Sequence, residues 1–209
     1  MADEKKQLRA LMREARDALS GERVASLSDQ IQRSLIESAI FANARTLALY
    51  SPIGNEVSTG LIFDRALASG RAVLFPRLDR AAASLVLARV TRPDELVAGA
   101  FGILEPPLSA PIVDPSSLDS CLVIVPGLAF SHAGERIGRA GGHYDRLLDV
   151  LSPQAISVGL AYSFQLLDRV PQSEHDRRLN YIVTESSLIR AQGRRATEGG
   201  VWDQGGIPR

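Results

Sequence analysis

Cysteine, long apolar stretches, aromatic residues and net charge are all scarce in this sequence. Its one cysteine, Cys121, has no partner for an intramolecular disulfide, which favours a reducing compartment. No apolar run approaches the roughly 18 residues of a membrane span, and residues 1–23 are too highly charged for a signal peptide. The 24 basic residues balance the 24 acidic ones, so bulk charge indicates neither nucleic acid nor a membrane as partner. We expect a cytoplasmic protein that acts as a monomer.

The length and apolar content suit one hydrophobic core. With 209 residues, 45% of them hydrophobic, the chain can bury a single good core. From Gln192 onward the apolar rhythm stops, and only a few anchors such as Trp202 remain. We therefore predict one α/β domain over residues 1–190 and a flexible tail over residues 191–209.

Periodicity predicts alternating strands and helices. Apolar residues three and four apart predict an amphipathic helix over 4–19 and a second helix after Ser20. Further helices are expected over 58–69 and 142–151, and residues 91–118, with five prolines, are expected to be connecting loop. Strands are predicted over 46–50, 72–75 (stopped by Pro76), 84–90, 121–125, 156–161 and 181–184. This order predicts a three-layer α/β sandwich with a mainly parallel, open, Rossmann-like sheet.

The most informative segment is VIVPGLAFSHAGERIGRAGGHYDR, residues 123–146. An apolar strand runs into a loop that combines glycines with Arg136 and Arg139 and ends at a helix start. Glycines let backbone N–H groups approach a phosphate, arginines offer forked donors, and the helix adds its positive end. The segment is neither a Walker A loop nor a dinucleotide-binding fingerprint, and a tight surface crossing is its plain alternative.

Three weaker signals stand elsewhere, each with a plain structural alternative. Lys5 and Arg9 share one helix face, as a solvated stripe also would. Glu56 follows the first strand, where open sheets bind ligands but where an acid also offsets a helix dipole. His175 and Asp176 in a loop are compatible with a metal site or with an ordinary turn.

Taken in order, these motifs resemble the 5-formyltetrahydrofolate cyclo-ligase family. The resemblance rests on Lys5-x-x-x-Arg9, Asn55-Glu56-Val57-x-Thr59, Pro126-Gly127-x-Ala129-Phe130, Gly134-x-Arg136-Ile137-Gly138, Gly142-x-Tyr144-Asp145, His175-Asp176 and Ile182-Val183-Thr184-Glu185. It covers about residues 4–190. It implies an ATP- and Mg²⁺-dependent ring closure of 5-formyltetrahydrofolate to 5,10-methenyltetrahydrofolate that releases ADP and phosphate.

The resemblance also implies site residues. Arg136, Tyr144 and Asp145 would be catalytic, and Glu56, Gly142 and Tyr144 would bind the folate. Asp145 and Asp176 would hold Mg²⁺. The ATP-binding set would be Lys5, Arg9, Gly134, Arg136, Ile137, Gly138, Arg139, Ala140, Gly141, Gly142, His143, Tyr144 and Asp145.

Three positions depart from the family pattern, which has glycine at Ala140, commonly an aromatic at His143 and frequently an aspartate at Asn180. Alanine tolerates a positive φ poorly. We therefore expect either that the loop backbone differs at Ala140, or that the family's glycine serves close approach of the backbone and not a positive φ. Two other functions stay open: a non-catalytic nucleotide- or folate-binding module on the same fold, and another α/β enzyme such as a sugar-phosphate isomerase, which needs an anion site but neither ATP nor metal.

Overall fold

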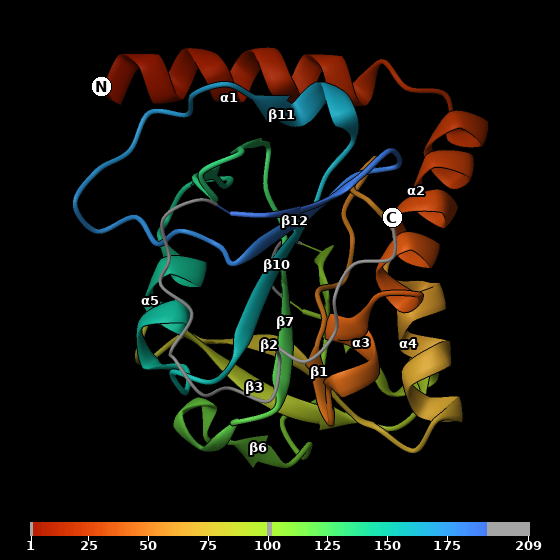
Figure 1. The fold of residues 1–209 in the computed structure, drawn as a ribbon. Coiled ribbons are helices and arrows are strands. Elements are labelled where there is room, and N and C mark those ends of the chain that lie inside the picture. The colour runs from red at the N-terminus through yellow and green to blue at the C-terminus, as the bar shows by residue number, and fades with distance from the viewer. Residues whose placement is uncertain (1, 100–101, 192–209) are drawn as a thin grey trace.

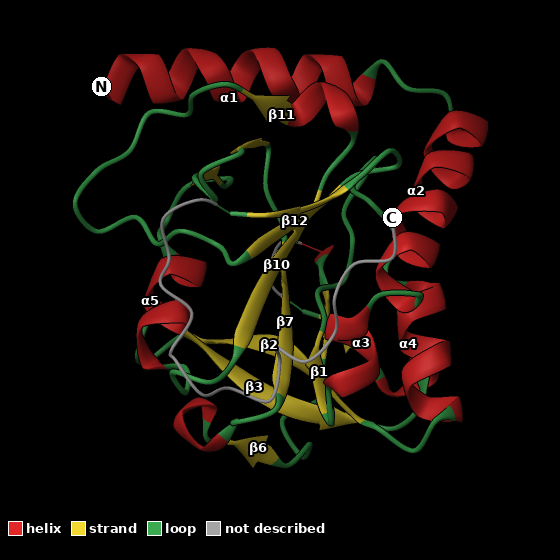
Figure 2. Ribbon diagram, viewed as in Figure 1, coloured by secondary structure: helices red, strands yellow, loops and turns green. Residues whose placement is uncertain are grey.

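The computed structural model describes residues 2–99 and 102–191 as a layered α/β structure around one mixed sheet (Figures 1 and 2). The strand order in this eight-stranded sheet is β13-β12-β10-β7-β1-β2-β3-β6. Five neighbouring strands from β12 to β2 are parallel, and β13, β3 and β6 are antiparallel to their neighbours. The predicted α/β sandwich with a mainly parallel sheet is confirmed.

The parallel strands form the centre because they are apolar on both faces. β7 (Cys121–Val125) and β10 (Ile156–Leu160) are buried at every position, as strands covered on both sides must be. They are flanked by β1 (Thr46–Ala48), β2 (Ala72–Asp79) and β12 (Tyr181–Val183). Cys121 is fully buried, and burial raises the pKa of its thiol to about 12, so it is a core residue, not a nucleophile.

Helices cover both faces of the sheet (Figure 1). α2 (Gly21–Ile36), α3 (Ala39–Asn43) and α4 (Gly60–Ala68) pack on one face, where Ile31, Leu35 and Phe41 join the larger apolar cluster. α5 (His143–Val150) packs on the other face through Leu147 and Leu148. α1 (Ala2–Asp17) lies apart from both layers and crosses the end of the sheet.

The remaining elements are short. β3 (Ser84–Val90), β6 (Ile112–Val113) and β13 (Leu188–Arg190) complete the main sheet. β8 (Ala129–Ser131), β9 (Arg136–Ile137) and β11 (Leu166–Leu167) form a three-stranded sheet under α1, and β4 (Val97–Ala98) pairs with β5 (Leu104–Glu105). Short 3₁₀ turns lie at Pro93–Glu95, Pro115–Ser117 and Ser163–Gln165.

Several predicted boundaries were wrong for identifiable reasons. Pro76 does not stop its strand. β1 pairs with β2 only as far as Leu74, so on the β1 side the missing N–H of Pro76 breaks no hydrogen bond of the sheet. On its other side β2 continues past Pro76, which pairs with Leu87 of β3. The predicted loop over 91–118 contains three two-residue strands, and α3 and β13 were missed. The Thr59 side chain, at the N-cap of α4, makes no cap hydrogen bond; Gln32 Oε1, from α2, accepts the N–H groups of Leu61 and Ile62 instead.

The end of the described chain is packed, not free. Ala191, which the sequence analysis placed in the tail, is buried, and its N–H donates to the Asn180 carbonyl oxygen at 2.9 Å. The rest of the predicted tail, with Trp202, lies outside the described residues. Within residues 2–99 and 102–191, no helix is long and apolar enough to cross a bilayer.

Candidate active site

The predicted site residues come together at the carboxyl ends of β1 and β7, where the order of the sheet reverses. The chain places β2 on one side of β1 and then returns to place β7 on the other. Glu56 follows β1, and the glycine-rich segment follows β7. Open α/β sheets bind ligands at such a switch point, because the two loops that leave it diverge and form a crevice.

α1 brings two cations to this edge. Lys5 Nζ donates to Ser173 Oγ at 2.8 Å and forms an ion pair with Asp176, and Arg9 Nε donates to the carbonyl oxygen of Gly138 at 3.0 Å. Burial by itself raises the pKa of the Asp176 carboxyl, but hydrogen bonds from Lys5 and from the Ser173 N–H outweigh burial and hold this pKa below its ordinary value. The Lys5–Arg9 face is thus packed against the loops at this edge and is not a solvated stripe.

Arg136 and Asp145 form the second ion pair. Arg136 Nη2 lies 3.0 Å from Asp145 Oδ1, which also accepts from the Arg177 N–H at 3.1 Å. The Arg136 side chain is only 4% exposed, and its Nε has no hydrogen-bond partner. A buried donor without a partner is costly, so this guanidinium has donor capacity left for a ligand.

Tyr144 lies beneath Arg136. The guanidinium carbon is 5.9 Å from the centroid of the tyrosine ring, within cation–π range. Burial, and secondarily the Glu56 carboxylate, raise the pKa of the Tyr144 hydroxyl. The hydroxyl therefore stays protonated and can donate a hydrogen bond.

The loop between β9 and α5 is left-handed over three successive residues. The φ angles of Ala140, Gly141 and Gly142 are 100°, 93° and 63°, and Gly142 is the N-cap of α5. The alanine at the family's glycine position therefore keeps the glycine-like conformation, at a cost of roughly 1–2 kcal/mol. His143, next in the chain, has its Nδ1 2.9 Å from Arg146 Nη2.

Two residues predicted to bind ATP lie below this loop and serve packing. Gly134 has a φ of 81°, and a Cβ there would lie 2.4 Å from the Leu179 carbonyl oxygen. Its N–H donates to Ser131 and its carbonyl accepts from Leu179. Ile137 packs in an apolar cluster with Met12 and Leu128. Their contact with ATP stays a prediction.

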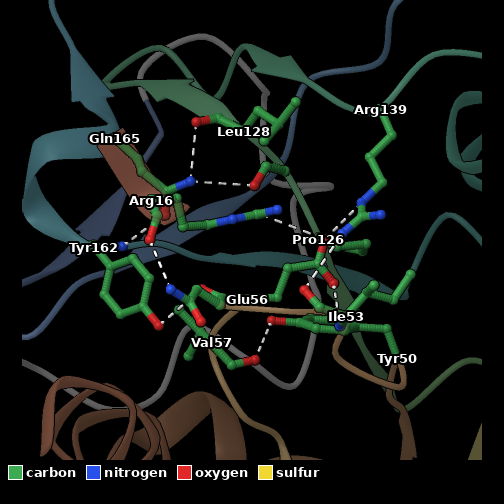
Figure 3. A network of polar contacts seen from close by, with 12 residues as sticks. Arg16, Tyr50, Ile53, Glu56, Val57, Pro126, Leu128, Arg139, Tyr162 and Gln165 are labelled. Atoms are coloured by element: carbon green, nitrogen blue, oxygen red, sulfur yellow. Dashed lines mark hydrogen bonds and ion pairs between the residues drawn. The ribbon is translucent and has the colours of Figure 1, made fainter. Parts of the chain in front are cut away.

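The opposite wall is built around Glu56, whose side chain is 6% exposed (Figure 3). The N–H of Ile53 donates to Oε2 at 3.0 Å. Two guanidinium groups face Oε1: Arg139 Nε at 3.0 Å and Arg16 Nη1 at 3.5 Å. Arg139 is 44% exposed and belongs to the glycine loop, whereas Arg16 is 4% exposed and belongs to α1.

Neighbouring polar side chains fix the loop that carries Glu56. Asn55 Nδ2 donates to the carbonyl oxygens of Arg16 and Leu19, both at 3.0 Å. The Tyr162 hydroxyl donates to the Asn55 carbonyl at 3.1 Å, and the Tyr50 hydroxyl donates to the Val57 carbonyl at 2.7 Å. Burial, and then Glu56, raise the pKa of Tyr50, so this donor also stays protonated.

Sequence reasoning missed Arg16, Tyr50 and Tyr162. A signal for Arg16 exists, because it stands seven residues after Arg9 and so continues the Lys5–Arg9 face. The two tyrosines each lie two residues beyond the end of a strand, β1 and β10 respectively, and carry no spacing signal.

The carboxylates predicted to hold Mg²⁺ each keep one oxygen without a hydrogen bond to the described residues. Asp145 uses Oδ1 and Asp176 uses Oδ2 in the contacts above. Among residues 2–99 and 102–191 there is no group of three or more histidine, cysteine, aspartate or glutamate side chains suited to a metal. One or two carboxylates completed by phosphate oxygens and water are nevertheless the usual Mg²⁺ arrangement, so these residues fit the ion.

A cation-rich glycine loop at the switch point of a mainly parallel sheet defines an α/β protein built to hold an anionic ligand. Comparison with known proteins makes this class specific. The chain belongs to the 5-formyltetrahydrofolate cyclo-ligase family, whose model matches residues 1–185. The predicted resemblance is confirmed.

Relatives and solved structures agree. The chain is 32% identical to the 5-formyltetrahydrofolate cyclo-ligase of Mycolicibacterium smegmatis over 74% of this chain and 80% of that protein. It is 30% identical to the 5-formyltetrahydrofolate cyclo-ligase of Escherichia coli K12 over 85% of this chain and 98% of that protein. The structure of Aquifex aeolicus 5,10-methenyltetrahydrofolate synthetase superposes with a TM-score of 0.79 at 34% identity, covering 93% of this chain and 96% of that one.

Proposed function

We propose that this protein is a ligase that converts 5-formyltetrahydrofolate to 5,10-methenyltetrahydrofolate at the expense of ATP, with Mg²⁺. Family membership supports the reaction. The observation that supports this site for it is the set of three cation–carboxylate pairs, Lys5–Asp176, Arg136–Asp145 and Arg139–Glu56, gathered among the loops that follow the parallel strands.

The chemistry requires activation of a poor electrophile. The nitrogen of a formamide donates into its carbonyl, so the formyl carbon resists attack. Transfer of the γ-phosphoryl group to the formyl oxygen makes that oxygen a leaving group. The neighbouring N10 amine then attacks the carbon, its proton is lost, and phosphate departs as the methenyl bridge forms.

Such a phosphoryl transfer needs positioning and charge neutralisation more than a protein nucleophile. Lys5, Arg9, Arg136 and Arg139 would neutralise the phosphates, together with N–H groups of the left-handed loop at the start of α5. Asp145 and Asp176 would hold Mg²⁺, which when bound neutralises charge on the phosphate oxygens. The unpartnered Nε of Arg136 supports its role.

The folate would lie toward β1. Glu56 is a fixed acceptor for the amino and ring N–H groups of a pterin, and Tyr144, with the backbone of Gly142, would line the pocket. This orientation directs the formyl group toward the glycine loop and the phosphates. A cytoplasmic location and a monomeric state belong to the same proposal, and the single buried cysteine supports a reducing compartment.

The test is purified protein with 5-formyltetrahydrofolate, ATP and Mg²⁺, followed by the near-ultraviolet absorbance of methenyltetrahydrofolate. Rising absorbance that depends on all three additions is expected. A flat trace with tight binding of either ligand would indicate a non-catalytic module, and a flat trace without binding would leave another α/β enzyme. The φ of Ala140 speaks against a decayed loop, because the alanine preserves the glycine-like backbone.

A further inference from the structure

Arg139 is placed in two roles that exclude each other. In the structure its Nε donates to Glu56 Oε1 and its Nη2 to the Ile53 carbonyl at 3.4 Å. In the proposed function the same guanidinium pairs with phosphate. One guanidinium cannot grip both the pterin-binding carboxylate and a triphosphate along the same face, so nucleotide binding takes Arg139 away from Glu56.

The departure of Arg139 would leave a buried carboxylate. The Glu56 side chain is buried, and a buried charge without a partner strongly disfavours the folded state. The other cation within reach of Oε1 among the described residues is Arg16, 3.5 Å away through Nη1. That distance is at the limit of a hydrogen bond, so the contact can tighten when Arg139 leaves.

The position of Arg16 is itself fixed by its surroundings. Its side chain is buried, its carbonyl oxygen accepts a hydrogen bond from Asn55, and its Nε has no partner among the described residues. An arginine is seldom buried with a free donor for stability alone, since an apolar residue of similar volume would stabilise the core as well or better. Figure 3 shows it reaching the Glu56 carboxylate from a different side than Arg139.

We propose, on the basis of the proposed function, that Arg16 is the positioning residue of the folate site: it keeps the charge and orientation of Glu56 when Arg139 turns to the nucleotide. Arg16 acts through Glu56 and touches neither phosphate nor pterin. Folate affinity in the presence of nucleotide therefore depends on Arg16, whereas nucleotide affinity does not.

The experiment measures the Kd of 5-formyltetrahydrofolate by calorimetry with Mg²⁺ and a non-hydrolysable ATP analogue present, and the Kd of the analogue alone. Arg16→Gln is expected to weaken folate binding about 10–100-fold, the loss of a hydrogen-bonded charge, and to change analogue binding less than about 3-fold. Arg13→Gln, an exposed arginine of the same helix, is the matched control and is expected to change neither.

A double-mutant cycle with Glu56→Gln separates positioning from general stability. Once Glu56 is neutral, Arg16→Gln is expected to weaken folate binding less than about 3-fold further. An undiminished Arg16 penalty in that background, or an equal loss for both ligands with a lowered Tm, would overturn the proposal. If Arg16→Gln does not fold, the cycle uses Arg16→Lys, which keeps the charge but not the fork: a 3–10-fold loss, roughly, supports the role and none overturns it.

Failure of the proposed function has a different signature. Wild-type protein that binds neither folate nor the analogue would remove the function and the role of Arg16 together. Wild-type protein that turns over, with Arg16→Gln indistinguishable from Arg13→Gln, would remove the role of Arg16 alone.

Discussion

The two walls of the crevice are built in opposite ways. The β1 wall, residues 51–59, is fixed by buried tyrosines, by Asn55 on the end of α1 and by the N–H of Ile53 on Glu56. The glycine-loop wall, residues 138–142, is exposed or half-buried and has three successive positive φ angles; Arg9 holds the Gly138 carbonyl oxygen, and the partly exposed Arg139 side chain reaches Glu56. Specific recognition of a rigid ring suits the first wall, and closure around a flexible phosphate chain suits the second.

The largest effect is expected from Asp145→Asn. It removes the carboxylate that pairs with Arg136 and would hold Mg²⁺, so turnover should fall by at least about 100-fold. Absorbance-monitored turnover and circular dichroism measure activity and fold together. Near-normal turnover by a folded variant would show that the glycine-loop wall works without this carboxylate.

Tyr50→Phe tests the rigidity of the β1 wall. The buried hydroxyl donates to Val57, so its loss leaves that carbonyl unpaired and should destabilise the protein by about 1–2 kcal/mol. The KM for the folate should rise while the KM for ATP stays within about 2-fold. Tyr181→Phe, on β12, is the control; equal effects of the two changes on the folate KM would contradict a prebuilt β1 wall.

Lys5→Met tests the ion pair beneath the glycine loop through its pH dependence. The folded pKa of Asp176 lies below its ordinary value of 3.8. The stabilisation is therefore fully present above about pH 4 and disappears as pH falls through the lower folded pKa. Thermal unfolding from pH 6 to pH 2 should show a difference between wild type and Lys5→Met of at most about 1 kcal/mol that shrinks with acid. A difference that grows with acid would contradict this assignment.

Ala140→Gly should give the smallest effect. Relief of the strained φ is partly offset by the freedom of glycine in the unfolded chain, so a gain of about 0.5–1 kcal/mol is expected. Turnover should stay within about 3-fold. Differential scanning calorimetry and steady-state kinetics measure both, and a lowered Tm would show that Ala140 is not strained.

The elements that could be predicted from the sequence are those with a clear apolar periodicity. The apolar β7 and the amphipathic α1 and α2 were predicted because burial on two faces or on one stripe leaves a clear pattern. Two-residue strands such as β9 leave none, and Pro76 ended a strand in the prediction because pairing on each side of a strand is a tertiary property.

For the site, the order of the motifs predicted which segments lie close together, but it could not separate the roles of residues within one motif. Gly134 and Gly142 look alike in sequence, yet one packs against Leu179 and the other opens α5. Arg16 resembles any surface arginine until Asn55 and Glu56 are placed beside it. The spacing from Arg9 puts Arg16 on the Lys5–Arg9 face, but its contact with Glu56, 40 positions away, has no local signal.

The docking of α1 has a consequence for the order in which the molecule matures. Lys5 meets its partners Ser173 and Asp176 across 168 and 171 positions of chain, and Arg9 meets Gly138 across 129. α1 can meet Glu56 after only 40 positions, through Arg16, but its Lys5 contacts must wait until nearly all of the described chain has been synthesised. The phosphate-binding residues are therefore assembled late, and a truncated nascent chain can have a folded core while its active site is still incomplete.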